Sequence, residues 1–218
     1  MLRAMLWKEV RDLRGWFALA VVAQLYLAGV ATGLEFGPLR AGGGVPFVDD
    51  FITYYFFFVA IPFAAVAGLW QTLLESLRGT YAFLLHRPAP RSQLFGVKIL
   101  VGGLATLIVA ALPVLIYTCW AAAPGNHASP FFWQMSLWAW QLAIATPIVY
   151  LGAFLSGLRP ARWFGSLLFP LAGSLFFLVL TQGLQATWIW PMGIPICLGV
   201  EALLVPVILY VAATRDYS

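Results

Sequence analysis

One acid, Glu201, is the only ionisable residue that lies well inside an apolar run of this sequence. Ionisable residues within membrane-spanning segments are costly to bury, and they usually mark a functional site. Glu201 could line or gate a path across the membrane. It could equally be a protonated structural acid that hydrogen-bonds to a neighbouring helix, because no cation lies in an apolar run to pair with it. The sequence leaves both interpretations open.

The other polar residues match no known catalytic pattern. The chain has no Gly-x-Ser-x-Gly elbow, no His-Glu-x-x-His pair and no Gly-x-x-x-x-Gly-Lys-Ser/Thr phosphate loop. Cys119 and Cys197 lack metal-type spacing and are expected to be buried free thiols. We therefore expect no catalytic, metal or cofactor site, and any ATP and Mg²⁺ would be bound by another subunit. The polar residues of apolar runs are expected to hydrogen-bond between helices: Gln24, Gln141, Thr146 and Gln182.

The composition indicates a helical membrane protein. Of 218 residues, 62% are hydrophobic and 9% are charged, whereas soluble domains carry about 25% charged residues. The apolar runs are continuous rather than alternating, which favours helices over a barrel. No stretch is long and polar enough for a separate soluble domain. We predict an all-α membrane protein whose residues 1–218 form a single transmembrane domain.

Six apolar runs reach the length of about 20 residues that a membrane span needs. The first is too long for the core of a signal peptide, so we expect it to be a span. Prolines and glycines crowd residues 183–198, which could form a re-entrant pair of helices instead of a simple turn. The predicted spans are about 16–34, 51–70, 99–120, 133–156, 163–182 and 192–213.

The basic residues predict the orientation in the membrane. With the N-terminus inside, only Arg40 of the 12 basic residues falls outside, and positive charge accumulates on the cytoplasmic side of membrane proteins. We therefore predict that both termini are cytoplasmic. Topology accounts for the net charge, so we expect no nucleic-acid partner. The basic residues placed inside are Arg3, Lys8, Arg11, Arg14, Arg78, Arg87, Arg91, Lys98, Arg159, Arg162 and Arg215.

Residues 2–14 form an amphipathic pattern that predicts a helix at the membrane surface, bending into the first span. Glu9 is anomalous because it falls inside the apolar face of this helix. A carboxylate there needs a cation, and the arginines of residues 71–98 are candidates. Alternatively, Glu9 tilts out to water.

Residues 71–98 form the longest polar passage of the chain. Leucines and Tyr81 recur every three or four residues over 73–85, which predicts a short amphipathic helix lying on the membrane surface. Pro88 and Pro90 would end it. Phe83 would point to water and could dock a soluble partner. The alternative is a membrane-anchoring helix with one stray phenylalanine.

Two stretches carry a resemblance to a known family. They read Trp7-Lys8-Glu9-x-Arg11 and Glu75-x-x-Arg78-Gly79-Thr80-x-x-Phe83-Leu84-Leu85-x-Arg87-Pro88-x-x-Arg91, the second followed by Lys98. Together with six spans, they resemble the ABC-2 type permeases of ATP-binding-cassette exporters. The resemblance covers the whole chain in topology, but its motifs are confined to these stretches. The short outer loops depart from family members that have a large extracellular domain.

The resemblance implies an elbow helix at 2–14 and a cytoplasmic coupling helix at 75–85 that docks on a separate ATPase. It implies a permease half in a bacterial inner membrane, paired with a second half and exporting a lipid-like or amphipathic substrate. The alternative is a non-transporting anchor or signalling subunit, and the lack of clustered polar residues disfavours an enzyme. The implied ATPase-docking residues are Glu75, Arg78, Gly79, Thr80, Phe83, Arg87 and Arg91, and those of the elbow are Trp7, Lys8, Glu9 and Arg11.

Overall fold

The apolar runs form six long helices in a computed structural model that describes residues 2–33, 45–48, 52–77, 90–127, 129–159, 164–185 and 192–214. Each is long and apolar enough to cross a membrane, which confirms the all-helical class and the six candidate spans. A short 3₁₀ turn, Trp133–Ser136, precedes α5. The helices are α1 (Leu2–Ala31), α2 (Ile52–Leu77), α4 (Arg91–Ala122), α5 (Leu137–Leu158), α6 (Phe164–Gln185) and α7 (Gly193–Thr214).

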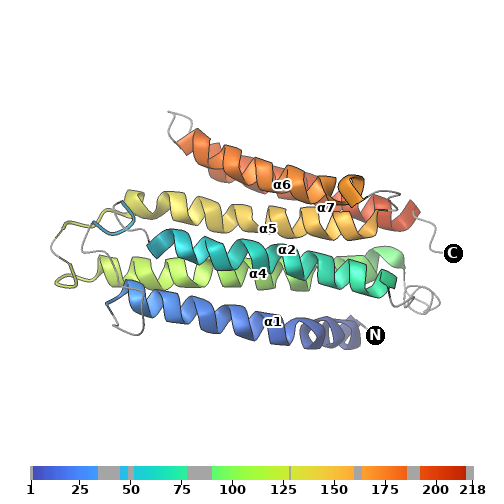
Figure 1. The fold of residues 1–218 in the computed structure, drawn as a ribbon, viewed down its shortest axis with the longest axis horizontal. Helices are drawn as coiled ribbons and strands as arrows, with labels where there is room; N and C mark the ends of the chain where they lie inside the picture. The colour runs from blue at the N-terminus through green and yellow to red at the C-terminus, as the bar shows by residue number, and fades with distance from the viewer. Residues whose placement is uncertain are drawn as a thin grey trace.

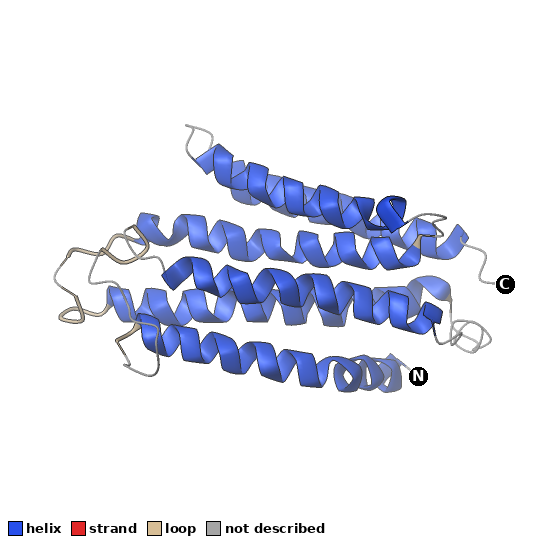
Figure 2. Cartoon of the chain, viewed as in Figure 1, coloured by secondary structure: helices blue, strands red, loops and turns tan. Residues whose placement is uncertain are grey.

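The helices run side by side along the long axis of the molecule (Figure 1). The start of α1 and the end of α7 lie at the same end of the bundle, as do the end of α2 and the start of α4. The loop between α4 and α5 lies at the opposite end (Figure 2). An even number of passes explains why the first and last helices share an end. That this end faces the cytoplasm stays a prediction.

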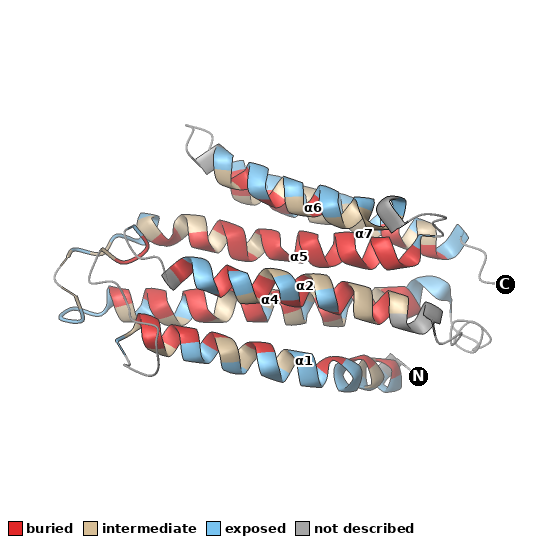
Figure 3. Ribbon diagram, in the orientation of Figure 1, coloured by how far each residue is buried: buried red, intermediate tan, exposed pale blue. Residues whose placement is uncertain are grey.

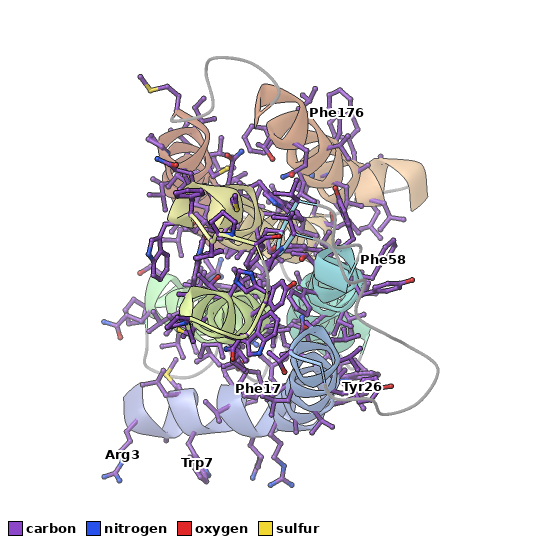
Figure 4. The ribbon with its side chains drawn as sticks, turned by 90° about the vertical axis from the view of Figure 1, so that its left-hand side faces the viewer. Arg3, Trp7, Phe17, Tyr26, Phe58 and Phe176 are labelled. Atoms are coloured by element: carbon purple, nitrogen blue, oxygen red, sulfur yellow. The ribbon has the colours of Figure 1, made fainter. Side chains whose placement is uncertain are left out.

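The first helix changes direction within its length. Figure 4 shows the segment that bears Arg3 and Trp7 running across the view, whereas the part near Phe17 and Tyr26 is seen end-on. Helical structure is nevertheless continuous from Leu2 to Ala31. The segment predicted as an elbow therefore lies crosswise to the bundle, and its location at a membrane surface stays a prediction.

Two helices extend beyond their predicted spans. α2 continues from the predicted limit at residue 70 to Leu77, and α4 begins at Arg91 rather than at residue 99. Residues 73–77 thus continue α2 and do not start a separate helix. The rest of the predicted surface helix, at 78–85, lies outside the described residues. No glycine or proline interrupts the sequence between residues 69 and 77, so nothing in the backbone forces α2 to end earlier.

α5 is the central helix of the bundle. It packs on α2, α4, α6 and α7, and Figure 3 shows it as the most continuously buried helix. In its most apolar stretch 83% of the residues are buried, against 17% in α6 and in α7. Small residues allow the close approach that membrane helices use: a Cβ added at Gly68 of α2 would lie 2.8 Å from the Cβ of Ala153.

Two predictions concern the edges of the bundle. Residues 183–185 form the end of α6 and 193–198 the start of α7; residues 186–191, where a re-entrant turn would have to lie, are outside the described part. The prediction of a buried thiol is confirmed for Cys197 and wrong for Cys119, which is exposed. Cys119 lies on the outward face of α4. Which face of α4 points outward depends on how this helix packs against its neighbours.

Candidate functional site

A buried ion pair lies near the end of the bundle where α1 begins. Glu9 of α1 and Lys98 of α4 meet with Oε1 and Nζ 3.1 Å apart, and their side chains are only 6% and 5% exposed. The expectation that Glu9 needs a cation from residues 71–98 is confirmed, although the cation is a lysine and not an arginine. The alternative, that Glu9 tilts out to water, is wrong.

Two further side chains complete this network. Gln71 of α2 donates from Nε2 to Glu9 Oε2 at 3.2 Å, and Lys98 Nζ donates to the backbone carbonyl of Gln71 at 3.3 Å. Tyr150 of α5 places its hydroxyl 2.7 Å from Gln71 Oε1 and 2.9 Å from the Lys98 carbonyl. The four residues Glu9, Gln71, Lys98 and Tyr150, called the Glu9–Lys98 network below, therefore link α1, α2, α4 and α5.

The position of Tyr150 depends on a glycine in α4. Gly102 lies one turn after Lys98, and a Cβ added to it would overlap the ring and hydroxyl of Tyr150. The missing side chain leaves room for the ring between the helices. The Tyr150 hydroxyl can then reach the polar groups of α2 and α4. All four members of the network are buried and hydrogen-bonded, as most buried polar groups are.

Apolar contacts hold the crosswise segment of α1 against the same part of α4. Met5 packs with Leu94 and Val97, and all three side chains are buried. This small cluster is separate from the main core. The first turns of α1 are thus attached to α4 twice, by apolar packing and by the ion pair.

The other predicted elbow residues lie outside the network. Trp7 is 70% exposed, and Figure 4 shows it and Arg3 pointing away from the bundle. Arg11 is also exposed. Lys8 is half-buried and lies 3.5 Å from Glu9, as a second and weaker partner of that carboxylate.

The predicted docking residues lie mostly beyond the described part of the chain. Glu75 is in α2, but its side chain is not described. Arg91 is the first residue of α4, and its Nη1 donates to the Ala213 carbonyl at the end of α7, at 3.1 Å. This contact brings the start of α4 to the end of α7. The remaining predicted docking residues, Arg78, Gly79, Thr80, Phe83 and Arg87, are outside the described residues.

The polar residues expected to bond between helices divide into two groups. Gln24 donates to the Phe56 carbonyl of α2, and Gln141 donates to the Thr181 carbonyl of α6, as expected. Thr146 instead bonds the Leu142 carbonyl of its own helix, so that prediction is wrong. Gln182 Nε2 is buried with no hydrogen-bond partner among the described residues.

No sequence pattern predicts a site role for Gln71 or Tyr150, and Lys98 enters only as the last residue of the motif that carries the family resemblance. Gln71 and Lys98 stand at the two ends of the polar passage, just outside the predicted spans 51–70 and 99–120. A signal was present, since each directly adjoins an apolar run. Among the described residues, no group of three or more His, Cys, Asp or Glu side chains could hold a metal ion.

The geometry of this end of the bundle can support a mechanical role. Within the Glu9–Lys98 network no nucleophile is paired with a base, and the charges of Glu9 and Lys98 neutralise each other. A network of this kind fixes the relative positions of four helices. Comparison with known proteins identifies no relative: no family model, curated protein or solved structure matches the chain.

Proposed function

We propose that this chain is the membrane-spanning permease subunit of an ATP-binding-cassette exporter of the ABC-2 type. It pairs with a second permease half, and separate ATPase subunits bind ATP and Mg²⁺. Residues 75–91 dock on the ATPase, and the crosswise start of α1 lies at the cytoplasmic surface as an elbow. The substrate is lipid-like or amphipathic, and the membrane is the plasma membrane.

One observation above all supports this function: the Glu9–Lys98 network joins four helices next to the docking segment. Lys98 lies seven residues after Arg91, about 10 Å along α4. Gln71 lies six residues before the end of α2 at Leu77. The network thus bridges α2 and α4, the two helices that residues 78–90 connect, and it links α1 and α5 to them.

This geometry suggests how a push on residues 78–89 would reach the spans. A displacement of the end of α2 or the start of α4 would be shared with α1 and α5, because an ion pair with hydrogen bonds on both partners resists separation. A motor at this end would then move four helices together. Such a motor shifts the permease between states only if it binds them with different affinities.

The test is co-purification from membranes in mild detergent with a candidate ATPase subunit, followed by measurement of ATP hydrolysis. We expect Phe83→Ala and Glu75→Ala to reduce both the amount of ATPase recovered and the substrate-stimulated hydrolysis. Phe132→Ala is the matched control, because Phe132 is a phenylalanine 56% exposed in the loop at the opposite end of the bundle.

Equal recovery and equal hydrolysis in all three variants would contradict docking through residues 75–91. Recovery of a partner that has no nucleotide-binding site would instead indicate an anchor or signalling subunit. Labelling of a cysteine placed at Thr80 by an impermeant reagent on intact cells would put this end of the bundle outside the cytoplasm and would refute the orientation.

A further inference from the structure

A groove of about 470 Å³ lies between α4, α5 and α7. Its walls are aliphatic side chains, glycine and proline, with one exception: among its lining residues only Glu201 is polar. Grooves of this volume fall within the size range of small-molecule sites, which combine apolar walls with a few placed polar groups. The groove therefore has the composition of a site for a mostly apolar molecule that carries one polar group.

One oxygen of the Glu201 carboxyl group lacks a hydrogen-bond partner among the described residues. Its Oε1 is buried and accepts no hydrogen bond, and no basic side chain lines the groove. A buried polar group without a hydrogen bond is costly. A ligand that brings a donor to Oε1 would remove that cost.

The depth of Glu201 restricts the route by which such a ligand arrives. Glu201 lies eight residues after the start of α7 at Gly193, about 12 Å along the helix, and so near its midpoint. Leu100, Leu104 and Leu198 line the groove and are each about half exposed. In a membrane these exposed side chains face lipid, so the groove is open sideways to the acyl chains.

We propose that the groove binds an amphiphile with a primary ammonium head and a single alkyl chain, entering from the lipid. The ammonium group donates to Glu201 Oε1, and the alkyl chain lies along the leucines of α4 and α7. An ammonium head stabilises the ionised form of the carboxyl group, and hydrogen bonds between charged groups are roughly twice as strong as those between neutral groups. This binding needs only the permease chain, so it goes beyond the proposed function and does not depend on the ATPase.

The experiment uses the purified full chain in mild detergent and a dodecylamine that carries a photoactivatable diazirine on its alkyl chain. After irradiation, mass spectrometry locates the modified peptides. We expect modification in α4 and α7 beside the groove, suppressed by excess dodecylamine and much less by dodecanol at equal concentration. Because both competitors have the same chain, the difference between them reports the ammonium group and not the apolar wall.

Three variants test the acid. Glu201→Gln keeps the shape but loses the charge, and we expect modification to fall about tenfold. Glu201→Asp keeps the charge and should retain more modification than Glu201→Gln. Leu203→Ala is the control on the same helix, because Leu203 is 70% exposed and does not line the groove; it should leave modification unchanged.

Equal competition by dodecanol would overturn the proposal, and so would modification of the groove that is unaffected by Glu201→Gln. Modification only outside α4, α5 and α7 would also overturn it. The competition experiment uses the unaltered chain, so it tests the proposal even if a variant fails to fold. None of these outcomes involves an ATPase, so a negative result here leaves the proposed permease function to its own test.

Discussion

Replacing Lys98 with methionine should destabilise the bundle far more than the same replacement at Lys8. Both lysines contact Glu9, but Lys98 is 5% exposed at 3.1 Å and Lys8 is 34% exposed at 3.5 Å. Removing one partner of a buried pair strands the other charge and costs about 3–5 kcal/mol. An exposed pair contributes under about 1 kcal/mol. At roughly 2–4 °C per kcal/mol for a chain of this size, Lys98→Met should lower the melting midpoint by about 6–20 °C.

The double variant Glu9→Leu with Lys98→Met tests whether the two residues act as a pair or contribute to stability independently. It removes both charges, so it should melt above Lys98→Met alone, although Gln71 Nε2 then loses its acceptor at a cost of about 1–3 kcal/mol. The assay is thermal unfolding of the purified chain in detergent, followed by the loss of the monodisperse peak in size-exclusion chromatography. The network would be refuted if Lys98→Met matched Lys8→Met, or if the shift of the double variant equalled the sum of the single shifts.

Two further predictions test the packing of α4. Gly102→Ala should destabilise by about 1–3 kcal/mol because its Cβ would overlap Tyr150; Gly103→Ala, which meets nothing within 4 Å, should instead stabilise slightly through helix propensity. Thermal unfolding measures both, and equal shifts would contradict the close contact at Gly102. Cys119, which is exposed, should react with N-ethylmaleimide in mild detergent, whereas Cys197 is buried and should not. Intact mass should therefore show one adduct, and none after Cys119→Ser; a second adduct would contradict the burial of Cys197.

The six helices were predictable because a membrane span can be recognised from consecutive residues alone, without knowledge of tertiary contacts. A continuous apolar run of about 20 residues has few alternatives once the chain is in lipid. The residues at which α2 ends and α4 begins were harder to predict from the sequence. Polar residues such as Gln71 and Lys98 indicate a loop when each is considered alone, and here their partners on other helices allow them to be buried.

The sequence predicted that Glu9 needs a cation, but it did not predict which residue supplies the cation. The periodicity of residues 2–14 placed Glu9 on an apolar face, which correctly required a cation. The choice of Lys98 over the arginines could not be derived, because it depends on the side of α1 against which α4 packs. The prediction that Cys119 is buried was wrong for the same reason. Hydropathy places a residue in the membrane but does not say whether the residue faces protein or lipid.

The enclosure of α5 by four other helices has a consequence for how this sequence can drift over evolutionary time. In α6 and α7, large side chains such as Phe176 and Leu203 face outward, so neutral changes should accumulate at most positions there, and intolerant positions should recur only about every third or fourth residue. α5 has no outward face over most of its length. Nearly every replacement in it meets a neighbour, so saturation mutagenesis should find intolerance at successive positions, without the helical rhythm seen in the helices around it.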